Sequence, residues 1–158
     1  MKKAIALVLA AIIAVIMVVA AATPVGAATV NVTATSNTKL VLSLNTGSVD
    51  FPSVDPDTGA EITGAVSAQV KSNVLWNLDV VATSDLVGSS ATVPIGNLQW
   101  QDQSNPGYIP FQLTNYTIAD HHGRGVTNYT FDYKINIGYD YPPDTYSTSL
   151  IYTLTQAP

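Results

Sequence analysis

Residues 146–158 read YSTSLIYTLTQAP, and this C-terminal stretch gives the clearest indication of the fold. Beginning at Tyr146, every second residue through Leu154 is Tyr, Thr or Leu, whereas most of the residues between them are Ser or Thr. Successive side chains of a β-strand point to opposite faces, so this alternation predicts a strand that is buried on one face. A terminal strand so rich in core residues must pair with others, and the chain is therefore expected to contain a β-sheet.

The same alternation recurs upstream of this stretch. It predicts strands over residues 29–35, 39–44, 66–71, 73–82, 95–101 and 127–137, with turn residues between them. Seven to nine short strands without a helical period after residue 27 predict an all-β fold, an immunoglobulin-like antiparallel β-sandwich. Residues 108–118 contain Pro110 and are expected to form an edge strand or a loop. Residues 52–64 and 120–125 are expected to be loops.

The first 27 residues have the composition of a secretory signal peptide. Lys2 and Lys3 supply the positive charge, residues 4–22 the apolar run, and residues 25–27 a cleavage site of small residues. The alternative is an uncleaved membrane anchor, because the run is close to the roughly 20 residues that span a bilayer. Pro24 and Gly26 favour cleavage, since they break a helix just before the site. We therefore expect a secreted or cell-surface protein with a single β-sandwich domain over residues 28–158.

Charge and cysteine content exclude several classes of function. Without Lys2 and Lys3, four Lys and Arg side chains stand against eleven carboxylates, a net charge of −7. Such an acidic chain repels phosphate backbones, so nucleic acid is not expected as a partner. The sequence has no cysteine, which excludes disulfides, thiolate metal sites and a thiol nucleophile.

Six residues of the C-terminal stretch form a spaced motif: Tyr146, Leu150, Thr153, Leu154, Ala157 and Pro158. Together with Trp76-Asn77-Leu78 upstream, this motif resembles that of the WxL family of Gram-positive cell-surface proteins. The sequence has Ile151 and Tyr152 where the family has Thr and Trp. The resemblance implies binding to the cell wall or to a surface partner, with Trp76, Leu78, Tyr146, Leu150, Tyr152 and Leu154 as motif residues. Their alternation with polar residues also predicts that they lie in the core.

Two groups of residues are candidates for metal binding. Asp55, Asp57 and Glu61 are hard oxygen ligands of the kind that suits calcium, but Asp-Pro and Asp-Thr-Gly are also common turn formers. A solvated turn is favoured, because a calcium site needs six to eight oxygens. His121 and His122 follow Asp120, and an exposed loop is favoured there because a zinc site needs at least three placed ligands. No other cofactor is expected.

The tyrosines are the remaining candidates for a binding surface. All eight lie between residues 108 and 152. Tyr108, Tyr116, Tyr139 and Tyr141 lie in turn-rich segments and are expected to form a surface patch, whereas Tyr129, Tyr133, Tyr146 and Tyr152 share the phase of core residues. No motif for a serine nucleophile or for phosphate binding is present, so catalysis is not expected. An acid pair such as Asp79 and Asp132 is the alternative, should the fold bring the two together.

These observations leave two main hypotheses for function, beside the third option of a carbohydrate-active or metal-dependent enzyme. The first is a secreted, non-catalytic surface protein whose sandwich binds a cell-wall polymer or a surface protein, as the WxL resemblance implies. The second is a subunit of an extracellular filament. In that case residues 29–44 would leave their own subunit and complete the sheet of the next copy.

Overall fold

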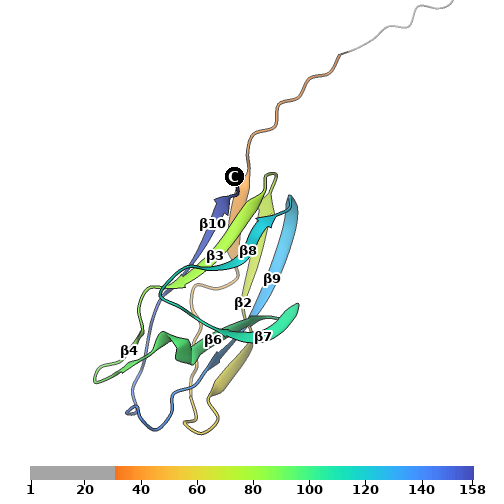
Figure 1. The fold of residues 1–158 in the computed structure, drawn as a ribbon. Helices are drawn as coiled ribbons and strands as arrows, with labels where there is room; N and C mark the ends of the chain where they lie inside the picture. The colour runs from red at the N-terminus through yellow and green to blue at the C-terminus, as the bar shows by residue number, and fades with distance from the viewer. Residues whose placement is uncertain (1–30) are drawn as a thin grey trace, which may run out of the picture. The chain divides into compact units, whose positions relative to one another are not determined.

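The computed structural model describes residues 31–158, so the predicted signal peptide lies outside the described residues. The chain divides into two units, Met1–Thr35 and Ser36–Pro158. In the first unit the described residues, 31–35, are exposed and form no strand. The second unit contains all the described strands (Figure 1). Among residues 31–158, no helix is long and apolar enough to cross a membrane.

Two antiparallel sheets form the two layers of the second unit. The larger sheet has the order β1-β2-β9-β6-β7 and the smaller has the order β10-β3-β8. The strands of the larger sheet are β1 (Leu40–Leu44), β2 (Ala60–Ser72), β9 (Gly125–Ile135), β6 (Leu98–Asp102) and β7 (Asn105–Pro110). Those of the smaller sheet are β10 (Leu150–Gln156), β3 (Trp76–Ala82) and β8 (Tyr116–His122). A two-residue pair, β4 (Leu86–Val87) and β5 (Thr92–Val93), and a 3-10 helix, η2 (Ile95–Asn97), complete the unit.

The core lies between the two layers and follows the alternation of the sequence. In β3, Trp76, Leu78, Val80 and Ala82 are buried, and the residues between them are partly exposed. Val80 and Ala82 pack in one buried cluster with Trp100, Phe131 and Tyr133 of the larger sheet, whereas Trp76 and Leu78 form a second cluster with Val70 of β2. The Trp100 and Phe131 rings meet edge to face with centroids 5.4 Å apart, an arrangement that adds to the stabilisation from burial alone.

The prediction of an all-β, antiparallel sandwich is confirmed. Ten strands are present among the described residues, where seven to nine were expected, because the chain also forms the short pair β4–β5. The segment 108–118, expected to be an edge strand or a loop, contains both: β7 ends at Pro110 at the edge of the larger sheet, residues 111–115 form a loop, and β8 begins at Tyr116. Proline is tolerated in β7 because an edge strand does not need every backbone N–H for pairing.

Four local expectations were wrong. Residues 31–35 alternate but form no strand, and β2 begins at Ala60, inside the expected loop. The expected loop 120–125 is the turn of the β8–β9 hairpin, with only residues 123 and 124 outside the strands. Strand β10 begins at Leu150, and before it the chain is tied to β4 by one bridge, between Ser147 and Val87.

The unequal lengths of β1 and β2 leave one side of the sandwich without a strand. β1 pairs with β2 from Leu40 opposite Ser72 to Leu44 opposite Ala68. Beyond that point β2 continues to Ala60 and pairs with β9 alone. The other edge of β2 over residues 60–66 is passed by the loop 45–59. In the described chain, one backbone hydrogen bond joins this loop to β2, from Asn45 N–H to Ser67 O at 3.0 Å.

Candidate functional site

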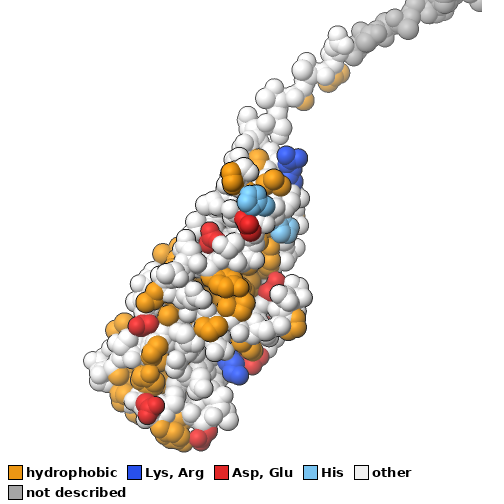
Figure 2. Space-filling model, viewed as in Figure 1, with side chains coloured by type: hydrophobic (Ala, Val, Ile, Leu, Met, Phe, Trp, Pro, Cys, Tyr) orange, Lys and Arg blue, Asp and Glu red, His pale blue; other side chains and the backbone are white. Residues whose placement is uncertain are grey.

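A cavity of about 1270 Å³ lies where β1 has ended, and we call it the seam groove. Its walls are the loop 45–56 and the segment 137–149, and its floor comes from both sheets. The floor residues are Val66, Leu98, Tyr133 and Ile135 of the larger sheet and Leu150 and Tyr152 of the smaller one. Figure 2 shows hydrophobic side chains, with a few acidic ones, on the surface at the lower end of the view, where these loops lie in Figure 1.

Side-chain hydrogen bonds hold the walls of the seam groove in place. The Asp144 carboxylate accepts hydrogen bonds from the Ser89 N–H at 2.6 Å and the Ser89 hydroxyl at 2.7 Å. These bonds, the hydroxyl bond above all, lower the pKa of Asp144. The Tyr146 hydroxyl donates to the Pro142 carbonyl at 2.7 Å, and the Tyr139 hydroxyl donates to the Asp57 carboxylate at 3.0 Å. The wall that contains residues 137–149 is therefore attached at several points.

The seam groove is apolar inside and acidic at its rim. Asp50 and Asp144 are among its lining residues, whereas no lysine, arginine or histidine is. Val49, Phe51 and Val54 of the loop pack against the core with their side chains partly buried. The loop therefore covers part of the core through side chains, without supplying the backbone hydrogen bonds that a strand beside β2 would supply.

The tyrosine patch expected from the sequence is only partly present. Tyr139 and Tyr141 line the seam groove, and Tyr139 is 76% exposed. Tyr108 and Tyr116 lie elsewhere and are partly buried. The Tyr116 ring packs edge to face on Trp100 with centroids 5.4 Å apart, and the Lys134 ammonium lies 5.5 Å from the centre of the Tyr108 ring. The four tyrosines therefore do not form one surface.

The residues of the WxL-like motif are brought together in the core. β10 pairs with β3 so that Leu154 lies opposite Leu78 and Gln156 lies opposite Trp76. Trp76 and Leu78 are fully buried, and the Trp76 indole donates a hydrogen bond to the Gly123 carbonyl at 2.9 Å. Tyr146, Leu150, Tyr152 and Leu154 are partly buried on one face of the C-terminal stretch. Trp76 and Leu78 therefore offer no contact surface, whereas Tyr146, Leu150 and Tyr152 line the seam groove.

One hydrogen bond of this stretch joins the two sheets. The hydroxyls of Tyr152 in β10 and Tyr133 in β9 lie 2.6 Å apart. Burial raises the pKa of Tyr133 to about 12, although its bond to Tyr152 partly opposes that shift. The pKa of Tyr152 is also raised, by burial first and then by its proximity to Tyr133. Both phenols therefore stay protonated at neutral pH.

The candidate calcium ligands are used to build a turn. The Asp55 carboxylate accepts from the backbone N–H groups of Asp57 at 2.8 Å and Thr58 at 3.1 Å. Glu61 lies in β2 rather than in this turn. Within residues 31–158, no group of three or more His, Cys, Asp or Glu side chains could hold a metal ion. The structure thus forms the turn that was favoured for Asp55 and Asp57, and it does not bring the three candidate calcium ligands together.

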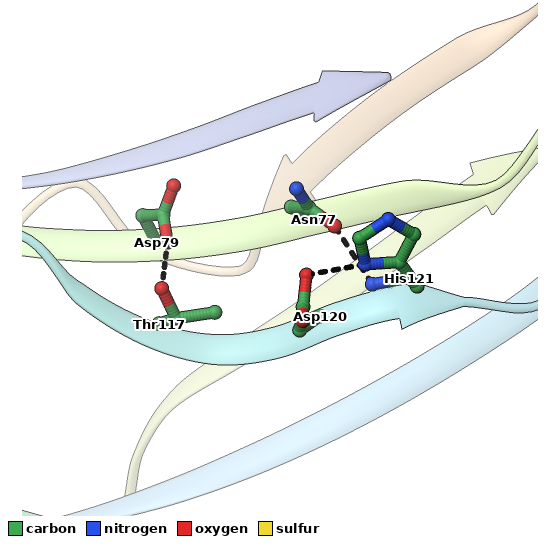
Figure 3. A network of polar contacts seen from close by, with 5 residues as sticks. All are labelled: Asn77, Asp79, Thr117, Asp120 and His121. Carbon is green, nitrogen blue, oxygen red and sulfur yellow. Dashed lines mark hydrogen bonds and ion pairs between the residues drawn. The ribbon is translucent and has the colours of Figure 1, made fainter. Parts of the chain in front are cut away.

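The two histidines also have separate surroundings. Figure 3 shows the His121 ring beside Asp120, with His121 Nδ1 2.7 Å from Asp120 Oδ1, while the His121 N–H donates to Asn77 at 2.7 Å. The His122 ring instead stacks on Trp76, with centroids 4.5 Å apart. They share no third metal ligand in the described chain. The arrangement fits a hairpin end rather than a metal site.

The two carboxylates that were considered as an acid pair lie in different sheets. Asp79 of β3 accepts a hydrogen bond from the Thr117 hydroxyl at 2.7 Å, as Figure 3 shows. Asp132 of β9 is buried and accepts from Gln101, Gln103 and the Gly64 N–H. Each carboxylate thus has its own hydrogen-bond donors, and neither hydrogen-bonds to the other.

Sequence reasoning did not identify the seam groove. The available signals were the apolar residues Val49, Phe51 and Val54 inside a segment otherwise typical of a loop. Comparison with known proteins gives no further guidance, because no protein-family model and no curated protein sequence matches this chain.

Proposed function

We propose that this chain is a secreted, non-catalytic cell-surface protein whose β-sandwich binds a partner in the seam groove. The observation that carries the proposal is the volume of the groove, about 1270 Å³, together with its aromatic walls. Pockets for small molecules typically enclose about 300–1,000 Å³. An occupant larger than a small molecule is therefore favoured, either a cell-wall polymer or a segment of a surface protein.

The chemistry of the groove supports a binding role rather than catalysis. Serines 147 and 149 are among the lining residues, but no histidine or lysine lies beside them to act as a base. A serine hydroxyl is a weak nucleophile without such a base. The Asp144 carboxylate already accepts hydrogen bonds from Ser89. Tyrosine walls offer contact area together with a polar hydroxyl, which suits recognition.

Secretion and attachment to the cell surface are proposed from the sequence. The first 27 residues have the composition of a signal peptide, and the C-terminal motif resembles that of WxL proteins. Such a protein meets wall polymers and other surface proteins as its first partners. The acidic rim, with Asp50 and Asp144, favours partners that are neutral or positively charged where they enter the groove.

Retention on purified cell walls and on immobilised surface proteins would test the proposal with two matched variants. Tyr139→Ala removes an exposed ring from the groove wall, whereas Leu113→Ala removes an exposed side chain that does not line it. We expect Tyr139→Ala to weaken retention about tenfold, which corresponds to about 1.4 kcal/mol, and Leu113→Ala to leave it unchanged. Equal retention of both variants would refute a role for the groove.

The second candidate function is a filament subunit assembled by strand donation. The exposed, unpaired state of residues 31–35 favours it, because these residues alternate like a strand but form none. The donor expected from the sequence, residues 29–44, is too long. Residues 40–44 are already paired with β2 as strand β1, and donating them would break that pairing.

A further inference from the structure

We infer that the occupant of the seam groove is the segment 31–35 of a second copy of this chain, added as a strand beside β2. The inference rests on the proposed function, because it names the partner of the same groove. Three observations support it. The edge of β2 over residues 60–66 has no strand partner in the described chain and lies beside apolar residues, and residues 31–35 have the alternation of a strand but form none. The segment 31–35 joins the second unit near the Ser72 end of β2, whereas the free edge lies at the other end.

The acceptor is the edge of β2 over residues 60–66. On this side β1 stops at Leu44, and β2 continues beyond it for more than a normal strand length. Val66 lines the groove, and it pairs with Phe131 of β9. Ala60 and Ile62 pair with Ile135 and Tyr133, two floor residues, and pack partly buried against the core. A strand placed here would continue the line of β1 and would cover the apolar floor. An exposed edge of this kind is a template for pairing with another chain.

The donor is the described part of the N-terminal segment, residues 31–35, which reads NVTAT. Its side chains are exposed, and Val32 is 88% exposed, an unusual state for valine. In an extended strand Val32 and Ala34 would point to one face and Thr33 and Thr35 to the other. Val32 and Ala34 would face the apolar floor. Thr33 and Thr35 would face solvent, and threonine is a residue type that favours β-strands.

The donor segment also fits the acceptor edge in its length and in its charge. Five extended residues span roughly 17 Å at about 3.3 Å per residue, and residues 60–66 span roughly 23 Å. The segment 31–35 carries no charged side chain, so it brings no carboxylate toward Asp50 and Asp144 at the rim. An anionic wall polymer would be repelled by the same two carboxylates. The charges of the groove therefore favour the protein segment over such a polymer.

The geometry of the second unit requires the donor to come from another copy. Residues 36–39 are tied to Asn73, whose side chain donates to the Asn37 carbonyl at 2.7 Å and accepts from the Lys39 N–H at 2.7 Å. Asn73 follows the Ser72 end of β2, and the groove begins near Val66, roughly 23 Å away along the strand. Residues 31–35 of the same copy reach only about 17 Å from Ser36. Donor and acceptor at opposite ends make a head-to-tail contact, which repeats into a filament.

Cross-linking between singly substituted proteins would test this contact. The chain contains no cysteine, so each added thiol is the only one present. Exported Val32→Cys protein is mixed with Ser149→Cys protein and treated with a short bismaleimide. Ser149 lines the groove and is exposed. The control mixture replaces Ser149→Cys with Thr117→Cys, an exposed position on β8 that does not line the groove. We expect at least tenfold more mixed dimer with Ser149→Cys than with Thr117→Cys.

A second measurement uses the two faces of the donor. Val32→Asp would place a charge on the face that enters the groove, and Thr33→Asp would place the same charge on the opposite face. We expect size-exclusion chromatography and negative-stain images to show loss of polymer for Val32→Asp only. Both positions lie outside the strands, so circular dichroism should report an unchanged fold for both variants.

The possible outcomes separate this inference from the function on which it rests. Equal cross-linking to positions 149 and 117 would overturn the donation between copies. If Tyr139→Ala still loses retention on cell walls in that case, the groove binds a wall polymer and the proposed function survives. Filaments that form normally while no partner retains the protein would instead leave self-assembly as the groove's only role.

Discussion

At the scale of single residues, Asp132 is the charged group whose burial needs an explanation. It is 5% exposed, and burial alone would raise its pKa. Hydrogen bonds from the Gly64 N–H at 2.7 Å and from the Gln101 and Gln103 side chains at 3.0 and 2.7 Å outweigh burial, and the pKa is lowered. The carboxylate therefore stays ionised at neutral pH and holds the bulge that interrupts β2 between Ile62 and Val66.

The first prediction concerns Asp132→Asn. The new amide group would present N–H donors to neighbours that are themselves donors, and Gln101 cannot simply reverse because its carbonyl oxygen accepts from the Gly107 N–H at 3.1 Å. We expect a loss of about 1.5–3 kcal/mol in the free energy of unfolding, measured with urea. Asp79→Asn is the control, because Asp79 is partly exposed and loses little. Equal losses would contradict this account of Asp132.

The second prediction is a loss of stability in alkali. Tyrosine 133 ionises near pH 10 in the unfolded chain, but burial raises its pKa to about 12 in the folded protein. Between these values the unfolded chain binds fewer protons, so the free energy of unfolding falls as the pH rises. Its contribution is complete below about pH 10 and is lost as the pH passes about 12, a change of about 2–3 kcal/mol. Urea unfolding between pH 8 and pH 12 measures it.

The matched control for the alkaline prediction is Tyr133→Phe combined with Tyr152→Phe. It removes both hydroxyls at once, so neither is left buried without its partner. The double variant should show a flatter decline of stability between pH 10 and pH 12. A decline as steep as that of the unsubstituted protein would assign the loss to other groups.

At the scale of strands, alternation was a sound guide wherever one face is buried. The predicted faces of β3, β6 and β10 are those that the structure buries. In β9 the exception is Asp132, which is buried in a polar phase because three donors surround it. The alternation of apolar and polar residues predicts which side chains share a face of a strand. It does not predict a hydrogen-bond network, such as that of Asp132, whose donors come from other strands.

The errors at this scale have two physical causes. β2 was expected to begin at Val66, because Gly64 and the bulge beside it hide the period of residues 60–65. Gly64 has a φ of +64°, which glycine adopts at little cost and which interrupts the pleat. Residues 31–35 have the opposite problem. Their period is that of a strand, but a strand also needs a paired edge, and no period tells whether one is present.

The candidate site was the least predictable part of the molecule. The seam groove is formed by residues near 50 and near 140, which are separated by most of the domain. Of the candidate binding residues named from the sequence, five line it: Tyr139, Tyr141, Tyr146, Leu150 and Tyr152. The motif residues Trp76 and Leu78 are core instead, which their alternation also predicted.

At the scale of the whole second unit, the side of the sandwich that contains β1 is closed by strands over one part of its length and by loops over the rest. β1 and β10 lie side by side (Figure 1), and Leu40 and Leu42 of β1 pack with Leu154 of β10 against the same buried cluster. Beyond Leu44 no strand of the described chain continues β1, and the seam is flanked by the loop 45–59 and the segment 137–149. Over residues 60–66, in the part of the chain that the structure describes, the β2 edge facing this loop has no strand partner, and we expect it to open more readily than the paired edge.

The last prediction follows from that weakness and concerns hydrogen exchange of backbone amides. In the monomeric Val32→Asp protein, the amides of β2 over residues 60–66 that point away from β9 have no strand partner in the described chain, so they should exchange rapidly. In assembled, unsubstituted protein a donated strand would bond them, and their exchange should slow at least tenfold. The amides of β9 between residues 127 and 131 are the control, because their pairing with β2 is present in both states. Slow exchange along the β2 edge in the monomer would show that the loop already protects it, and strand donation there would then be wrong.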